Sequence, residues 1–139
     1  MKIDTTFLRR CILTLNEALE RLNKANAKSI EYDLYRSACI KEFEIILEQS
    51  GKLLRKSLKK FMHSSKSVDQ LYFKDVYRHA AKYGIITDDE CERWLIYRDN
   101  RNSTAHDYGL QFAESTLKLL PEFINDSNSV ADSIDKLNS

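Results

Sequence analysis

Apolar residues recur every three or four positions along most of the chain, a spacing that predicts amphipathic helices. The first predicted helix follows Asp4, a candidate N-cap. Its apolar stripe consists of Leu8, Ile12, Leu15, Leu19 and Leu22. Side chains at this spacing share one helical face, so one side of the helix is expected to pack against the rest of the protein.

The second predicted helix opens at Ser29 and extends to about His63. Its apolar seam consists of Ile30, Leu34, Ala38, Ile46, Leu54, Leu58 and Phe61. At the rise of an α-helix this segment would be about 50 Å long, which is unusual for a small protein. Gly51 is therefore interpreted as a bend or a break in the helix.

Two capping signals divide the next part of the chain. Ser67 and Gln70 have the spacing of a capping box, which predicts a third helix that Gly84 would end. Thr87 and Glu90 repeat the signal and predict the start of a fourth helix. The apolar face of that helix begins with Cys91, Trp94 and Leu95.

The helical pattern fails between Asp99 and Gly109 and then resumes. The last apolar stripe consists of Ala113, Leu117, Leu120 and Ile124. Pro121 lies within it and predicts a kink or a restart. Residues 126–139 are expected to form at most a weak, fraying tail helix.

These elements predict an all-α fold, an up-down bundle of four to five helices in one domain over residues 1–139. The low counts of three glycines and one proline agree, because strands and tight hairpins need such residues. Neither an N-terminal apolar run nor a membrane-length apolar segment is present, and the three widely spaced cysteines suit a reducing compartment. A cytoplasmic protein without membrane association is therefore expected.

The candidate chemistry lies where the helical pattern fails, in the segment Arg101-Asn102-Ser103-Thr104-Ala105-His106-Asp107-Tyr108. A histidine can exchange protons near neutral pH, and an arginine offers a charged planar fork to a phosphate. Five residues apart on a continuous helix, Arg101 and His106 would point about 140° away from each other. They can converge if the helix breaks, or if Arg101 of one chain meets His106 of a second copy. The alternative is that Arg101 is only a helix C-terminal cation and His106 a surface residue.

The pattern Arg101-Asn102-x-x-x-His106-x-Tyr108 resembles the R-x4-H-x-Y signature of the HEPN superfamily. More narrowly, the chain resembles its HepT-like group, also described as nucleotidyltransferase substrate-binding proteins. The resemblance covers most of the chain: its length, the long second helix, the Trp94 helix leading into the motif, and the late position of the motif.

This resemblance implies a homodimeric, metal-independent ribonuclease toxin whose partner is a minimal nucleotidyltransferase acting as antitoxin. It implies that Arg101 and His106 are the catalytic pair, with Asn102 in support, and that Tyr108 accepts AMP from the partner. A second reading is a subunit without catalytic activity that docks the nucleotidyltransferase and its nucleotide.

A second candidate site is a run of cations at helical spacing: Lys52, Arg55, Lys56, Lys59 and Lys60. The run could follow an RNA backbone, since the formal net charge of +1 means that nucleic-acid binding would need a local patch. A solvated helix face is the preferred alternative, because charge stripes usually mark solvent, and a membrane-surface helix is a third and weaker one.

Several aromatic residues could stack on bases, although on helices they are more often core or dimer interface. They are Tyr32, Tyr35, Tyr72, Phe73, Tyr77 and Tyr83.

No cofactor or metal site is predicted. His63 and His79 have no ligand spacing to a cysteine or a carboxylate, and the chain has no Gly-rich phosphate loop. The chain is therefore not expected to be the nucleotidyltransferase itself.

Overall fold

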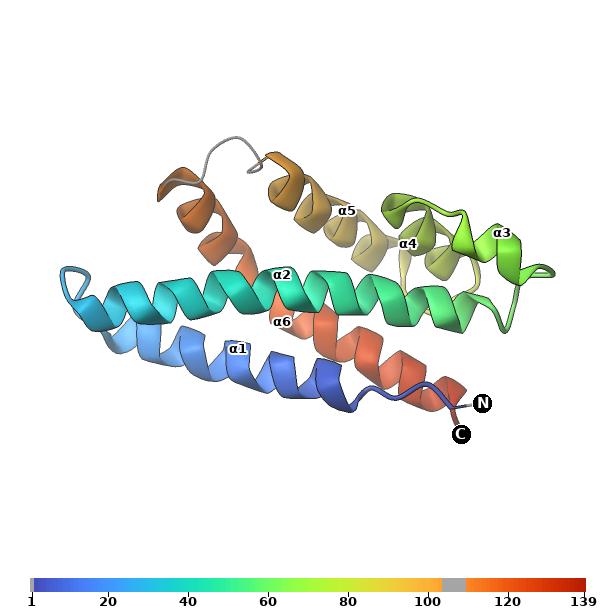
Figure 1. The fold of residues 1–139 in the computed structure, drawn as a ribbon, viewed down its shortest axis with the longest axis horizontal. Helices are drawn as coiled ribbons and strands as arrows, with labels where there is room; N and C mark the ends of the chain where they lie inside the picture. Colours follow the sequence, from blue (N-terminus) through green and yellow to red (C-terminus); the bar gives the residue numbers. More distant parts are fainter. Residues whose placement is uncertain (1, 104–109) are drawn as a thin grey trace.

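The computed structural model describes residues 2–103 and 110–139, and these form helices without any strand (Figure 1). The elements are α1 (Thr6–Lys24), α2 (Ile30–Leu58), α3 (Ser65–Asp69), α4 (Phe73–Lys82), α5 (Asp88–Ser103) and α6 (Leu110–Leu137). The predicted all-α class is confirmed. The described helices number six rather than four to five.

The helices α1 and α2 form a long antiparallel hairpin, and α6 packs across both of them (Figure 1). The helix α4 packs against α2, and α5 contacts both α4 and α6. The motif-bearing helix α5 thus lies between a short helix on one side and the last helix on the other.

The core between α2, α5 and α6 is aromatic. The fully buried Trp94 ring stacks on Tyr77 with ring centroids 4.9 Å apart, and Phe43 lies 4.7 Å from Phe123. Tyr97 meets Phe123 edge to face at 5.0 Å. Such pairs contribute about 0.5–1.5 kcal/mol each beyond the area that they bury, so they fix how α5 sits on its neighbours.

The three cysteines behave as small hydrophobic residues. Cys11, Cys39 and Cys91 are buried and free of disulfides. Burial raises the pKa of the Cys39 thiol to about 11, so this group stays protonated near neutral pH.

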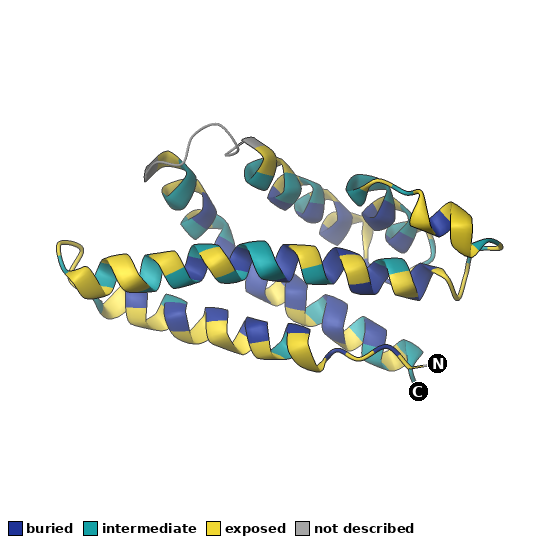
Figure 2. Ribbon diagram, viewed as in Figure 1, coloured by how far each residue is buried: buried dark blue, intermediate teal, exposed yellow. Residues whose placement is uncertain are grey.

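The second helix is shorter than predicted, and two of its first seam residues do not face the core. It ends at Leu58, and Ile30 and Leu34 are 74% and 63% exposed. Figure 2 shows that α2 is mostly exposed at its start and buried farther along. The predicted seam was therefore wrong at these two positions, because the start of α2 packs on the core through the face that carries Tyr32 and Tyr35.

Gly51 does not break α2, so this part of its interpretation as a bend or a break was wrong. The helix is continuous from Ile30 to Leu58, and the ring of Phe73 packs directly on Gly51. A Cβ atom at this position would lie 2.9 Å from Phe73 Cε2. The glycine is needed for the close approach of α4 to α2.

The predicted third helix is divided into α3 and α4. The Ser64 hydroxyl caps α3 by accepting a hydrogen bond from the Ser67 N–H at 3.2 Å, in place of the predicted Ser67–Gln70 box. The helix ends at Asp69, and α4 begins at Phe73. Sequence reasoning missed this interruption because no glycine or proline marks it.

The two later boundary predictions are confirmed. Gly84 has a φ of +75°, and the Ile85 N–H donates to the Ala80 carbonyl at 2.9 Å, as in a Schellman motif that ends α4. The Thr87 N–H donates to the Glu90 carboxylate at 2.8 Å, and the Glu90 N–H donates to the Thr87 hydroxyl at 3.1 Å. This reciprocal pair is the predicted capping box.

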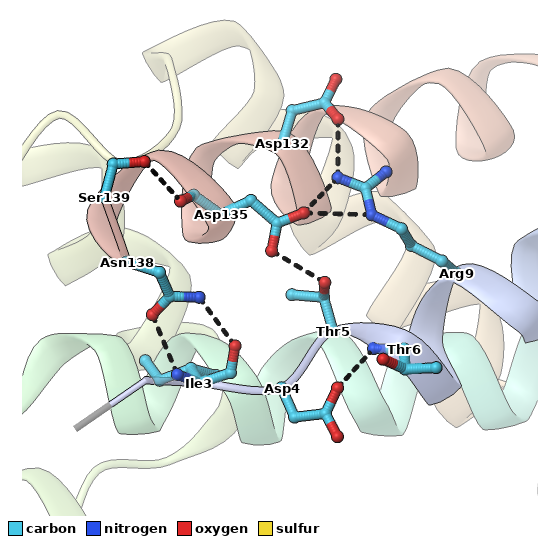
Figure 3. A network of polar contacts seen from close by, with 9 residues as sticks. All are labelled: Ile3, Asp4, Thr5, Thr6, Arg9, Asp132, Asp135, Asn138 and Ser139. Carbon is cyan, nitrogen blue, oxygen red and sulfur yellow. Dashed lines mark hydrogen bonds and ion pairs between the residues drawn. The ribbon is translucent and has the colours of Figure 1, made fainter.

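The helix α6 continues through Pro121 to Leu137, so residues 126–137 are part of it. Its end is tied to the start of the chain (Figure 3). The Ile3 N–H donates to Asn138 Oδ1 at 2.9 Å, and Asn138 Nδ2 donates to the Ile3 carbonyl at 2.8 Å. Arg9 also pairs with Asp132 and Asp135. The two ends of the chain therefore lie together.

Across residues 2–103 and 110–139, none of the helices combines the length and the apolar character that a membrane span requires.

Candidate functional site

The polar run from Asp99 to Gly109 falls where α5 gives way to α6. The helix α5 includes Arg101 and Asn102 and ends at Ser103, and α6 starts at Leu110. His106 and Tyr108 lie in residues 104–109, outside the residues that the structure describes. The structure therefore places the first half of the predicted motif.

Arg101 lies in the last turn of α5 and contacts α2. Its Nε atom is 2.9 Å from Glu44 Oε2, and the two side chains are 41% and 37% exposed. A pair that water reaches to this extent contributes about 0–1 kcal/mol, so it orients the guanidinium without locking it in place.

Asn100 joins α5 to α6 immediately before the motif. Its Nδ2 atom donates to the Thr116 hydroxyl at 2.9 Å, and the Ser115 hydroxyl donates to its Oδ1 atom at 2.8 Å. Thr116 is fully buried. This contact holds the last part of α5 to the first part of α6. Sequence reasoning missed the role of Asn100. Its amide side chain does not stand out from the polar residues that surround it in the sequence.

A buried polar cluster fixes α5 two turns farther back. Arg93 donates two hydrogen bonds of 2.8 Å to Asp126 of α6, and the Tyr97 hydroxyl donates a third. Asp126 is 3% exposed. Burial, and then the hydrogen bond to this carboxylate, raise the pKa of Tyr97, while the same carboxylate raises the pKa of Arg93. The helix that carries Arg101 is thus held to α6 by charge as well as by packing.

Asn102 is exposed and lines a hollow between the start of α4 and the second half of α5. The hollow has a volume of about 370 Å³. The other residues that line it are Tyr72, Phe73, Lys74, Asp75, Arg78 and Arg98.

The five predicted RNA-binding cations separate into two kinds. Lys52, Lys56, Lys59 and Lys60 are exposed. Arg55 instead donates to the backbone carbonyls of Val68 and Leu71 at 2.7 and 2.9 Å, which holds the link between α3 and α4. Lys59 also pairs with Asp69 at 3.0 Å.

In the part of the chain that the structure describes, no group of three or more His, Cys, Asp or Glu side chains is arranged to hold a metal ion.

Comparison with known proteins gives one family. The model for the family described as nucleotidyltransferase substrate binding protein like matches residues 7–136, which is nearly the whole chain. The chain belongs to this family. The resemblance inferred from the motif and the helix pattern is confirmed at this level.

One curated relative and two solved structures agree with this membership. The relative is a protein of Haemophilus influenzae named probable ribonuclease HepT, 25% identical over 99% of this chain and 95% of its own length. The structure of HI0074 from Haemophilus influenzae, described as the fold of a substrate binding domain of a nucleotidyltransferase, matches with a TM-score of 0.81. It is 22% identical and covers 95% of this chain and 99% of its own. A crystal structure from Thermus thermophilus matches with a TM-score of 0.72 at 24% identity, over 91% of this chain and 98% of its own. These two similarities show the fold.

Proposed function

We propose that this protein is a metal-independent endoribonuclease, the cytoplasmic HEPN toxin of a two-gene module, and that a minimal nucleotidyltransferase neutralises it. The observation that carries the proposal is the Arg101-x4-His106 spacing at the junction of α5 and α6. It occurs in a chain whose family match covers residues 7–136 and whose curated relative is named a probable ribonuclease.

In the proposed reaction the ribose 2′-hydroxyl attacks the adjacent phosphorus. A bond forms between O2′ and phosphorus while the bond from phosphorus to O5′ breaks. His106 assists proton transfer, which removes the proton from the 2′-hydroxyl or delivers one to the leaving O5′. Arg101 stabilises the negative charge that develops on the phosphate oxygens. The products are a 2′,3′-cyclic phosphate and a free 5′-hydroxyl.

We infer a homodimer as the active form from the resemblance to HEPN proteins. Arg101 lies in the last turn of α5, which ends at Ser103. On a continuous helix, His106 would face away from Arg101 by about 140°. A break in the helix would remove this conflict, and so would a cleft shared by two copies, in which Arg101 of one meets His106 of the other.

The test is cleavage of a single-stranded RNA by the purified protein in the presence of a metal chelator. Wild-type protein is expected to cleave and to leave 2′,3′-cyclic phosphate ends, detected by mass spectrometry. His106→Ala and Arg101→Ala are each expected to lower the rate by at least about 100-fold. His63→Ala is the matched control, because His63 lies outside the motif. Unchanged cleavage by His106→Ala would refute the proposal.

Tyr108 is the proposed site of regulation. An adenylyl group on its hydroxyl would add bulk and negative charge beside the cleft, where an RNA phosphate must bind. With ATP and the partner, wild-type protein is expected to gain the mass of AMP and lose cleavage activity, whereas Tyr108→Phe should keep both its mass and its activity.

A second candidate function is a subunit without catalytic activity that docks a nucleotidyltransferase and its nucleotide. The description of the matched family favours it. It predicts a stable complex with the partner and no RNA cleavage by the folded, unmodified chain. The cleavage test above separates the two functions.

A further inference from the structure

The hollow beside Asn102, here called the Tyr72 hollow, gathers three cations around two aromatic rings. It is lined by Tyr72, Phe73, Lys74, Asp75, Arg78, Arg98 and Asn102. Lys74, Arg78 and Arg98 bring positive charge, and Asp75 is the one carboxylate among the described residues of the lining. Each cation also has a carboxylate partner, so an anionic ligand would bind here by replacing these carboxylates.

The guanidinium group of Arg98 lies over the ring of Phe73. Its guanidinium carbon lies 4.3 Å from the centroid of Phe73, and its ion pair with Glu48 is long, at 4.0 Å. Stacking engages the faces of the guanidinium and leaves the N–H groups at its edges directed outward, the geometry that binds a phosphate. Phe73 is itself fixed, since it rests on Gly51 and lies 4.9 Å from the buried ring of Tyr77.

Lys74 and Arg78 form ion pairs with exposed carboxylates, which a bound phosphate could replace. Lys74 contacts Asp99, and Arg78 lies 3.1 Å from Asp75, with all four side chains at least 36% exposed. Exposed pairs of this kind contribute about 0–1 kcal/mol, so a phosphate can replace the carboxylates at little cost.

Tyr72 has no structural role that accounts for its exposure. Its side chain is 82% exposed, in contrast to the fully buried Tyr77 farther along α4. It occupies the N-cap position of α4 but makes no capping hydrogen bond through its side chain. An aromatic ring left in water beside cations is suited to stack on an unpaired base.

The hollow adjoins the motif and continues toward the cations of α2. Asn102, which lines it, follows Arg101 directly in the chain. Phe73 also lines a second hollow of about 210 Å³, together with Glu48, Gly51, Lys52, Arg55 and Val76. A single-stranded RNA that crosses Phe73 would pass from the exposed Lys52 to the motif.

We propose that the Tyr72 hollow binds one nucleotide of single-stranded RNA next to the cleaved bond. Its base stacks on Tyr72, and its phosphate binds Arg98 and Arg78. This assignment rests on the proposed ribonuclease function for its biological substrate. Duplex RNA is disfavoured, because the faces of a base inside a duplex are covered by the bases stacked above and below it.

The test measures binding separately from cleavage. The probe is a fluorescent single-stranded RNA of about ten nucleotides with 2′-O-methyl riboses, which lack the nucleophilic hydroxyl. Tyr72→Ala is expected to raise the Kd by about 10-fold or more, and Tyr72→Phe to bind like wild type. Arg78→Ala and Arg98→Ala should each lower the slope of log Kd against log salt by about one.

Two controls match these variants at exposed sites on α1. Phe7→Ala removes a ring that is 56% exposed, and Arg10→Ala removes an exposed cation. Neither should change the Kd or the salt slope. Wild-type binding by Tyr72→Ala, or equal losses in the controls, would overturn the proposal.

The two proposals fail separately. If wild type binds the probe through Tyr72 but cleaves no RNA, the hollow stands as a nucleic-acid site and the ribonuclease proposal fails. If cleavage of RNA depends on His106 but Tyr72→Ala binds the probe like wild type, the ribonuclease proposal stands and only the proposed role of the Tyr72 hollow is refuted.

Discussion

Two aspartates of α6 are each bound by one arginine and one hydroxyl group, yet water reaches them very differently. Asp126, 3% exposed, accepts hydrogen bonds from Arg93 and from the Tyr97 hydroxyl. Asp135, with a side chain 42% exposed, accepts them from Arg9 and from the Thr5 hydroxyl. The first set joins the motif helix to α6, and the second joins the start of the chain to its end.

The comparison shows that the same set of groups can have unequal importance for folding. When an arginine is removed beside Asp135, water solvates the carboxylate that remains. When one is removed beside Asp126, a buried charge loses most of its compensation, which costs far more. The protein therefore uses the buried set to fix α5, where the placement of Arg101 depends on it, and the exposed set to close the chain ends.

The largest difference is expected between Arg93→Met and Arg9→Met. Arg93→Met should lower the free energy of unfolding by about 3 kcal/mol, because Asp126 keeps only the Tyr97 hydroxyl as a partner. Arg9→Met should lower it by about 1 kcal/mol or less. Urea unfolding of both variants measures the two values. Equal losses of unfolding free energy in the two variants would mean that the burial of Asp126 does not make its ion pair more important than that of Asp135.

The second-largest effect is expected at alkaline pH, which should weaken the contacts of the buried tyrosines, including the hydrogen bond from Tyr97 to Asp126. Burial and Asp126 raise the pKa of Tyr97, and burial raises that of Tyr77, so the folded protein keeps protons that the unfolded chain loses above about pH 10. The two tyrosines should therefore leave the free energy of unfolding unchanged below this pH and lower it above, by up to about 1.4 kcal/mol per pH unit each. The buried cysteines, whose pKa values are also raised, should add a fall that begins at about pH 9.

Denaturant midpoints between pH 9 and pH 11 test this dependence. Tyr97→Phe should make the fall shallower, because Phe has no proton to lose. Thr5→Val removes the corresponding hydroxyl of the exposed set and should leave the slope unchanged. A slope that Tyr97→Phe does not alter would contradict the assignment.

The smallest effect is expected at acid pH in the exposed set. The hydrogen bond from Arg9 holds the pKa of Asp135 below its ordinary value of about 3.9. Its contribution is complete above this pH and is lost as the pH falls through the lower pKa of the folded state. Solvent screening keeps the loss below about 1 kcal/mol. Titration of Asp135 by NMR should show the lowered pKa return toward its ordinary value in Arg9→Met.

Sequence reasoning succeeded where the determining contact is local. Thr87 and Glu90 satisfy each other within one turn, and Gly84 supplies the positive φ that ends α4. Such features depend on neighbours in the chain. The catalytic roles of Arg101 and His106 rest on their spacing in the sequence and stay a prediction.

Sequence reasoning failed where the determining contact is distant. Periodicity shows that Ile30 and Leu34 share a helical face, but not whether another helix covers that face. Gly51 was interpreted as a bend or a break because the residue that packs on it, Phe73, lies in another helix. Tyr72 and Tyr77 are the same residue type in neighbouring turns, and only the packing of α4 distinguishes the exposed ring from the buried one.

The contact between Ile3 and Asn138 has a practical consequence for protein engineering. Two hydrogen bonds join the backbone of Ile3 to the side chain of Asn138. A segment fused to the N-terminus and a segment fused to the C-terminus would therefore start close together on the surface. A short linker can connect the two ends, and the chain can be reopened in the turn between Lys24 and Ile30. Such a circular permutant keeps every helix intact and offers a second, differently placed attachment point for labels and immobilisation.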